Sequence, residues 1–210
     1  MKTLKLMKMA VLFALSFLLS SNLFASSQFI LSNDGLIDSR VINKINEIGQ
    51  ESRQKLGVNI YVYTKKSLGL KEGTSTKDKI EFIKNQEQEL VTALKKPYVV
   101  LTMAVEDTHV NLIVSSQLKE VVDKNEILNE YVIPLLASKD KNTLFAKVSA
   151  AVLNGYAAIA DTISEKKGVE LQSSIGNSGK VTGTIWRVFM YTLIVLGLLA
   201  YIYAVLKSRK

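Results

Sequence analysis

The placement of two uncharged apolar runs at the two ends of the chain most constrains what it can become. The first run, Met9–Leu19, follows three lysines and precedes small residues that end at Ala25. A positive segment, a short apolar core and a small residue before the cut are the layout of a secretory signal. We therefore predict a signal peptide at residues 1–25. The alternative is an uncleaved first segment that anchors the protein at this end as well.

The second run, Val188–Leu206, contains no charged residue and is followed at once by a basic tail. An uncharged helix of this length spans the roughly 30 Å hydrocarbon core of a bilayer. Basic residues beside such a helix favour the cytoplasmic side. We predict a transmembrane helix at residues 184–206 and a cytoplasmic tail at 207–210. The chain would then be a single-pass protein of the bacterial inner membrane, with its soluble domain on the periplasmic side.

The net charge of +8 does not indicate nucleic-acid binding. Seven of the 27 basic residues lie in or beside the two apolar ends, which leaves 20 basic residues against 19 acidic ones in the middle of the chain. A nearly neutral domain lacks the basic surface that binds phosphate backbones. We therefore expect no nucleic-acid partner.

The chain has no cysteine. In an exported protein this excludes a disulfide framework, a thiolate metal site and a cysteine nucleophile. The fold must therefore depend on its own apolar core. Residues 26–165 are enough for one domain with a single core.

Apolar spacing and turn residues predict the secondary structure of this domain. We expect helices at 39–56, 77–95, 126–137 and 142–163, and strands at 28–31, 58–64, 98–105 and 109–115. Asp38 or Ser39 would cap the first helix, and Gly57 would end it. The last two strands are separated by a short polar turn, which predicts a hairpin. This order of elements predicts an α/β sandwich.

Residues 166–183 are rich in glycine and serine. Such a composition predicts a flexible linker with a root-mean-square reach of roughly 20–25 Å. The linker would connect the soluble domain to the transmembrane helix and leave it free to move over the bilayer.

Four stretches in order carry a family resemblance: Asn33–Ile37, Leu56–Thr64, Ile127–Leu136 and Phe145–Ile163. They are an opening Asp in a small-residue turn, a Gly followed by a strand, a helix that ends in Ile-Pro, and a helix of small residues. In these the chain resembles the TPM domain family, named after a thylakoid lumen phosphatase, a photosystem II repair protein and a modulator of an acetylcholine receptor. The resemblance implies a Rossmann-like α/β sandwich, in some members with a divalent cation in a cleft near the opening Asp.

The chain also departs from the family's pattern. The family usually has Gly-Tyr-Gly-Leu-Glu after the hairpin, whereas this chain has Ser115–Lys119 there, so that both glycines are absent and Lys119 replaces the Glu. Lys96-Pro97 replaces the usual Asn-Gly before the buried strand. A lysine in place of an expected carboxylate argues against cation binding at that position.

Three residues are candidate ligands of Ca²⁺ or Mg²⁺, which prefer oxygen donors. They are Asn33 and Asp34 in the opening turn and Asp107 in the hairpin turn. The alternative is that Asn33 and Asp34 shape the turn before the first helix, and that Asp107 belongs to a solvated turn. His109, the single histidine of the chain, is expected at a surface or edge position of its strand rather than as a catalytic base.

Two hypotheses about function follow. The first is a non-enzymatic accessory module, tethered to the membrane, that binds, stabilises or aids the turnover of an integral membrane protein complex. The alternative is a divalent-cation-dependent phosphatase of the exported compartment. A cleft with at least three converging carboxylates would distinguish the second hypothesis from the first. We favour the first, because the sequence offers one clear member of such a set and a lysine nearby.

Overall fold

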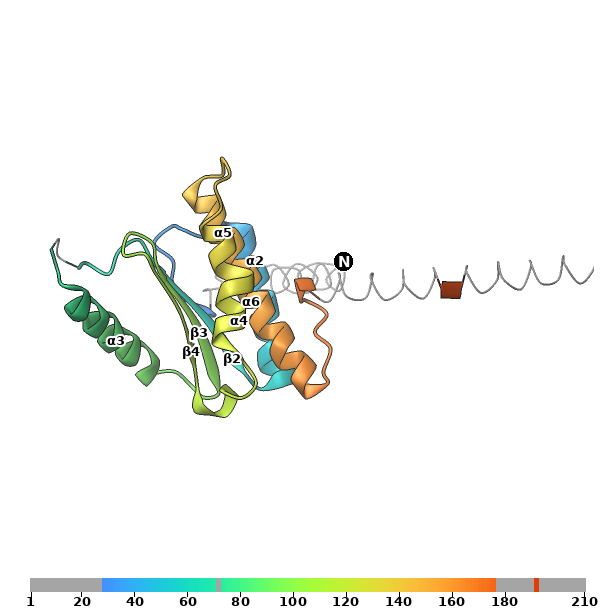
Figure 1. The fold of residues 1–210 in the computed structure, drawn as a ribbon. Helices are drawn as coiled ribbons and strands as arrows, with labels where there is room; N and C mark the ends of the chain where they lie inside the picture. The colour runs from blue at the N-terminus through green and yellow to red at the C-terminus, as the bar shows by residue number, and fades with distance from the viewer. Residues whose placement is uncertain (1–27, 71–72, 177–190, 193–210) are drawn as a thin grey trace, which may run out of the picture.

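The computed structural model describes residues 28–70, 73–176 and 191–192, and in this part of the chain it contains a four-stranded sheet (Figure 1). The strands are β1 (Ile30–Ser32), β2 (Asn59–Lys65), β3 (Tyr98–Ala104) and β4 (His109–Val114), in that spatial order. The first three strands are parallel, and β4 pairs antiparallel with β3 as the predicted hairpin. The α/β class is therefore confirmed. The predicted signal peptide, tail and nearly all of the predicted transmembrane helix lie outside the described residues.

The helices follow the predicted order, with ends shifted by a few residues. The first helix, α2 (Ser39–Glu51), continues into a π-helical turn, η2 (Ser52–Leu56). A long helix, α3 (Thr76–Thr92), connects β2 to β3. After the hairpin come η3 (Ser116–Leu118), α4 (Lys124–Glu126), η4 (Ile127–Val132), α5 (Ile133–Leu136) and α6 (Leu144–Lys167). Within these described residues, no helix has the length and apolar character needed to span a membrane.

Local signals at the ends of the first helix act as predicted. The Asp38 side chain accepts a hydrogen bond from the Arg40 amide at 2.8 Å and so satisfies an otherwise unpaired N–H of the first turn. Gly57 ends the helical segment with a φ of 66°, a conformation that residues with a Cβ rarely adopt.

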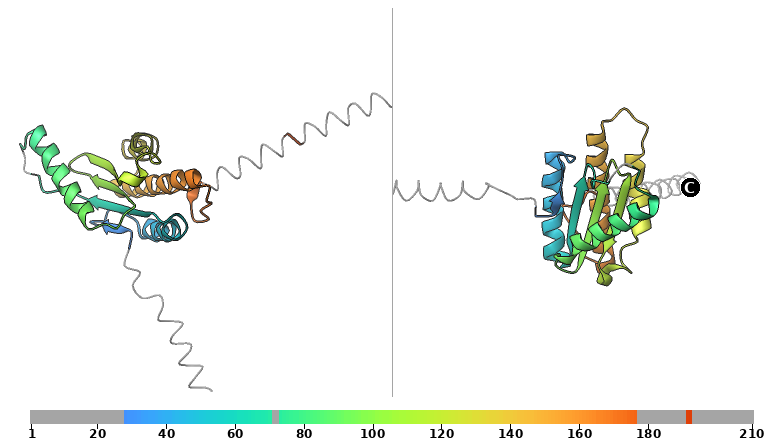
Figure 2. Two further views of the ribbon diagram at one scale, coloured as in Figure 1. Left: turned by 90° about the horizontal axis from the view of Figure 1, so that it is seen from below. Right: turned by 90° about the vertical axis from the view of Figure 1, so that its left-hand side faces the viewer.

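The helices cover the two faces of the sheet unequally. Helices α2 and α6, with the segment from α4 to α5, lie on one face, and α3 lies alone on the other (Figure 2). The strands β1, β2 and β3 are parallel neighbours in sequence order. The connections β1–α2–β2 and β2–α3–β3 therefore advance in the same direction across the sheet but pass over opposite faces. Such a pair must have opposite handedness, so one of the two is a left-handed crossover, which is rare between parallel strands.

Close packing distinguishes the face covered by α2 and α6. Tyr156 of α6 is fully buried, and its hydroxyl donates to the Ile60 carbonyl at 2.9 Å. A Cβ atom at Gly49 would lie 2.5 Å from the Tyr156 hydroxyl and 2.6 Å from the Phe29 ring. Burial raises the pKa of the Tyr156 phenol well above its ordinary value. Gly49 thus lets α2 approach α6 closely, and this contact forms the centre of the core.

The structure differs from the predicted linker at its beginning. Helix α6 extends to Lys167 and ends at Gly168, which has a φ of 63°. The chain then folds back onto the domain, where Leu171 is 1% exposed and Ser173 and Ser174 are buried. The described part of the linker is therefore not a free tether, because Leu171 has apolar surface to bury. Residues 177–183 lie outside the described part.

Candidate functional site

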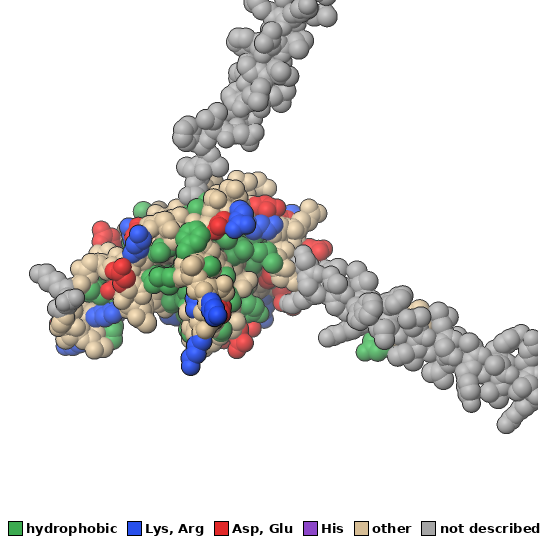
Figure 3. Space-filling model, turned by 90° about the horizontal axis from the view of Figure 1, so that it is seen from above, with side chains coloured by type: hydrophobic (Ala, Val, Ile, Leu, Met, Phe, Trp, Pro, Cys, Tyr) green, Lys and Arg blue, Asp and Glu red, His purple; other side chains and the backbone are tan. Residues whose placement is uncertain are grey.

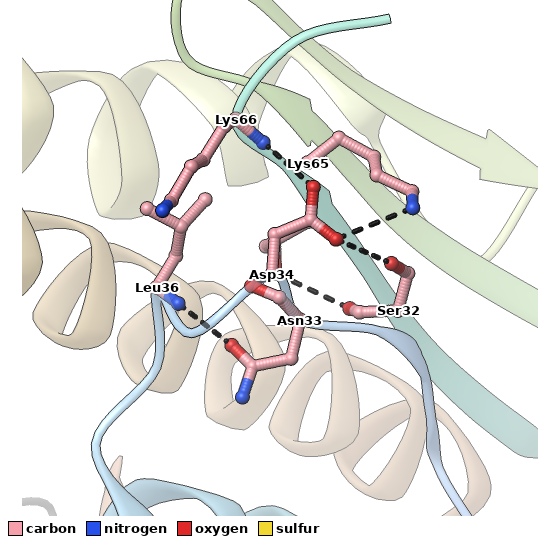
Figure 4. A network of polar contacts seen from close by, with 7 residues as sticks. Ser32, Asn33, Asp34, Leu36, Lys65 and Lys66 are labelled. Atoms are coloured by element: carbon pink, nitrogen blue, oxygen red, sulfur yellow. Dashed lines mark hydrogen bonds and ion pairs between the residues drawn. The ribbon is translucent and has the colours of Figure 1, made fainter.

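The opening turn holds the first two predicted ligands (Figure 4). The Asn33 side-chain carbonyl accepts hydrogen bonds from the Leu36 amide at 3.0 Å and the Ile37 amide at 2.8 Å. Asparagine commonly closes turns in this way, by replacing a backbone acceptor with its side chain. The side-chain oxygen of Asn33 therefore shapes the entry into α2.

Asp34 lies beside the end of β2. Its Oδ1 is 3.2 Å from the Lys65 Nζ, and its Oδ2 accepts a hydrogen bond from the Lys66 amide at 3.2 Å. The Lys66 hydrogen bond and the nearby Lys65 ammonium lower the pKa of the Asp34 carboxyl, although partial desolvation opposes them. The carboxylate is ionised and already has donors from this chain at both oxygens.

Asp107 is buried, whereas a solvated turn was the expected alternative to a metal ligand. Its Oδ2 accepts hydrogen bonds from the Leu68 amide at 2.7 Å and from the Ser67 hydroxyl at 3.3 Å. Its backbone carbonyl accepts from the Lys79 ammonium at 2.7 Å. The side chain therefore fixes the loop that follows β2.

The structure thus brings Asp34 and Asp107 to one segment, residues 65–68, at the carboxyl ends of the parallel strands. Open parallel sheets commonly bind ligands at this edge. Within residues 28–70, 73–176 and 191–192, no three His, Cys, Asp or Glu side chains are grouped so that they could hold a metal ion. The cation site remains a prediction. Calorimetric titration of Ca²⁺ and Mg²⁺ into the full chain, with Asp34→Ala as the comparison, would test it.

A polar cluster beneath α3 was not anticipated from the sequence. The Glu87 carboxylate accepts hydrogen bonds from the Thr102 hydroxyl at 2.7 Å and the Asn111 amide at 2.5 Å, and it lies 2.9 Å from the His109 Nε2. His109 is on the edge strand β4, as expected, but it is largely covered by this contact.

The chemistry of this cluster follows from its burial. Desolvation raises the pKa of the Glu87 carboxyl, but hydrogen bonds from His109, Thr102 and Asn111 outweigh it, so that the pKa lies below its ordinary value. The carboxylate therefore stays ionised and joins α3 to β3 and β4. One signal could have revealed it: Glu87 continues the apolar stripe of α3, four residues after the buried Ile83.

Exposed apolar side chains gather at the end of the domain where α5 and α6 meet. Ile133 is 41% exposed, Leu144 is 53% exposed and Phe145 is 42% exposed. We call Ile133, Leu136, Leu144 and Phe145 the apolar end. Figure 3 shows hydrophobic side chains gathered on this side of the molecule.

Two hollows adjoin the apolar end. One has a volume of about 490 Å³ and is lined by residues that include Met103, Val110, Ile133, Leu136 and Leu144. The other has a volume of about 530 Å³ and lies between α2 and α6, with a lining that includes Val41, Phe145, Ala150 and Leu153. Leu144 lines the first hollow and Phe145 lines the second, so both hollows adjoin the first turn of α6.

Polar contacts fix the loop between α5 and α6 beside the apolar end. Thr143 caps α6 by accepting a hydrogen bond from the Ala146 amide at 3.2 Å. The Lys147 ammonium is 3.3 Å from the Asp140 carboxylate and also donates to the Ser138 carbonyl. The loop is therefore held by its own charges, and the exposed lysines Lys139 and Lys141 flank the apolar surface.

Comparisons with known proteins bear on the fold. No protein-family model matches the chain, and no curated protein matches it. The chain is similar to the solution NMR structure of the N-terminal domain of a protein from P. gingivalis, with a TM-score of 0.50 and 13% sequence identity. The similarity covers 67% of this chain and 85% of that chain. At this identity, the likeness concerns the fold alone.

Proposed function

We propose that the chain is a membrane-tethered, extracytoplasmic accessory module with a Rossmann-like domain of the TPM type. Its apolar end binds an integral membrane protein complex, which it stabilises or helps to turn over. The observation that carries this proposal is the apolar end itself, with large side chains held in the open beside two hollows. The resemblance in sequence and the predicted signal and anchor support the location.

Burial of the apolar end provides the free energy for binding. Complete burial of a large aliphatic or aromatic side chain contributes roughly 1.5–3 kcal/mol. Ile133, Leu144 and Phe145 each have about half of their surface left to bury. Because Lys147 already holds the loop in place, little conformational entropy is lost when a partner binds.

The partner's chemistry follows from the surroundings of this surface. An apolar segment of a membrane protein, near the bilayer surface, would fill the hollows beside Leu144. The exposed Lys139 and Lys141 would favour acidic side chains next to that segment, since complementary charges guide and orient association.

Photo-crosslinking in the membrane tests the proposal. A photoreactive amino acid replaces Leu144 in the full chain, and the same residue replaces Ile80 as a control. Ile80 is 62% exposed and apolar, but it lies on α3, on the opposite face of the sheet. We expect a discrete adduct with an integral membrane protein from position 144 and none from position 80. Equal adducts from both positions would overturn the proposal.

A matched pair of charge substitutions tests whether the contact matters. Leu144→Glu should release the protein from its complex on a native detergent gel, whereas Ile80→Glu should leave the complex intact. If position 144 crosslinks to lipid or to a second copy of the chain instead, the apolar end has a different occupant and the proposal fails.

A further inference from the structure

We propose that residues 169–174 form a strap that binds the end of α2 and fixes the point where the chain leaves the domain. The strap thereby sets the length of the tether to the predicted membrane anchor. The existence of the strap does not depend on the proposed function, whereas its effect on the tether does.

Glu51, the last residue of α2, is the centre of the strap's attachment. Its Oε1 accepts a hydrogen bond from the Gln172 amide at 2.9 Å, and its Oε2 accepts from the Ser173 amide at 2.8 Å and the Ser173 hydroxyl at 2.5 Å. One carboxylate thus holds two successive amides and a hydroxyl. Hydrogen bonds to an ionised acceptor are stronger than those between neutral groups.

Two lysines add contacts on the same side of the domain. Lys55 lies 2.7 Å from the Glu51 carboxylate and donates to the Glu170 carbonyl at 3.1 Å. Lys167, in the last turn of α6, donates to the Leu56 carbonyl at 2.7 Å. These contacts join the end of α6 and the start of the strap to the η2 turn.

Apolar packing and a close approach complete the attachment. Leu171 is 1% exposed and belongs to the main core of the domain. Ser174 donates a hydrogen bond to the Asp161 carboxylate of α6. A Cβ atom at Gly176 would lie 2.1 Å from the Asp161 Oδ2, so a larger residue at position 176 would require the Asp161 side chain or the backbone to move.

The Glu51 carboxylate that holds the strap remains ionised over the ordinary pH range. Partial burial raises the pKa of the Glu51 carboxyl, but hydrogen bonds from Lys55, Ser173 and the two amides outweigh it and lower the pKa to about 2. Mild acid therefore leaves this carboxylate charged and able to accept the hydrogen bonds of the strap.

The strap shortens the predicted tether. A Gly/Ser-rich linker over residues 166–183 would reach roughly 20–25 Å, and the strap removes residues 169–174 from that free length. A closed strap therefore holds the domain nearer to the bilayer, and an open strap lengthens its range. The tether is therefore shorter when the strap is closed and longer when it is open.

Hydrogen exchange of the full chain tests the strap. In the native protein we expect the amides of Gln172 and Ser173 to exchange at least about tenfold more slowly than in an unstructured peptide. Glu51→Ala should abolish this protection. Glu47→Ala, at an exposed position on the same helix, should not change it. Ser173→Ala provides a milder variant, which should reduce the protection without altering α2. Unprotected amides in the native chain, or no effect of Glu51→Ala, would overturn the proposal.

A distance measurement tests the effect on the tether. Because the chain has no cysteine, Lys84→Cys provides a single labelling site on α3. Energy transfer to labelled lipid headgroups in vesicles should weaken when Glu51→Ala is added, because the domain moves away from the bilayer. An unchanged distance would overturn the effect on the tether. If the protein does not associate with vesicles, the proposed function fails, while hydrogen exchange still decides whether the strap exists.

Discussion

The two faces of the sheet are stabilised in different ways. On the face covered by α2 and α6, Gly49, Phe29 and Tyr156 pack without space for one more carbon atom. On the other face, Ile83 is the one buried residue of α3, and the Glu87 carboxylate supplies three polar contacts to the sheet. The apolar packing on the first face is spread over many contacts and leaves no room for added atoms, whereas the polar cluster on the second face depends on one charged group.

This difference predicts a difference in dynamics. Regions with few buried apolar contacts open locally at a lower free energy than the core. Helix α3 should therefore open from the sheet while α6 remains in place. Three substitutions and a change of pH test this difference between the two faces.

The largest effect is expected for Gly49→Ala. The added Cβ atom would overlap Tyr156 and Phe29, and overpacking of this kind costs about 1–3 kcal/mol. Urea denaturation of the purified protein should show this loss of unfolding free energy. Gln50→Ala, at the next and exposed position, is the control and should be nearly neutral. A neutral Gly49→Ala variant would show that the α2–α6 contact is looser than described.

Glu87→Ala should act mainly on α3. Its removal leaves Thr102, His109 and Asn111 without their shared acceptor, and the loss of such hydrogen bonds costs about 1–3 kcal/mol. Amide exchange should accelerate through residues 76–92 and stay unchanged in α6. Lys84→Ala, on the exposed side of α3, serves as the control. Equal acceleration in α3 and α6 would contradict the separation of the two faces.

Tyr156→Phe should have a smaller and global effect. It removes the donor to the Ile60 carbonyl but leaves the ring in the core, and we expect a loss of about 1 kcal/mol. The loss should appear equally in chemical denaturation and in the exchange of the most protected amides of α6. A change confined to α3 would contradict this assignment.

Acid should reproduce part of the Glu87→Ala effect. The pKa of Glu87 in the folded protein is lower than its ordinary value of 4.5, so the folded state stabilises the ionised form. This contribution is present above pH 4.5 and is lost as the pH falls through the lower, folded pKa. Amide protection of α3, corrected for intrinsic rates, should fall in that window in the native protein. It should stay level in Glu87→Gln, which cannot titrate there, and a parallel fall in that variant would assign the effect elsewhere.

The sequence predicted the elements of the domain well because their signals are local. Helical spacing, the Asp38 cap and the Gly57 stop depend on residues within one or two turns of each other, and the structure confirms them. The side of the sheet that α3 covers could not be predicted in this way. It depends on Glu87 meeting two strands that follow it in the chain.

Contacts between distant residues also explain why parts of the candidate sites were missed. Glu51 and Ser173 are 122 positions apart, and nothing in the glycine- and serine-rich segment indicates that a carboxylate holds it. Leu144 and Phe145 follow the Thr143 cap as ordinary members of a predicted helix. Their exposure depends on where α5 lies, which periodicity does not reveal. Asn33, Asp34 and Asp107 were predicted as cation ligands in two separate turns. That Asp34 and Asp107 both accept hydrogen bonds from the loop after β2 could not be read from their spacing.

The position of α6 at the end of the domain has a consequence for how the chain matures. This helix brings Val152, Tyr156 and Ile159 to the core, and it is the last element to be synthesised before the strap. A chain that emerges with its N-terminus first therefore carries a sheet with one incompletely covered face until Lys167 has appeared. Completion of the domain coincides with the arrival of the predicted anchor, so a chain that stops before Leu144 would offer its unprotected face to proteases.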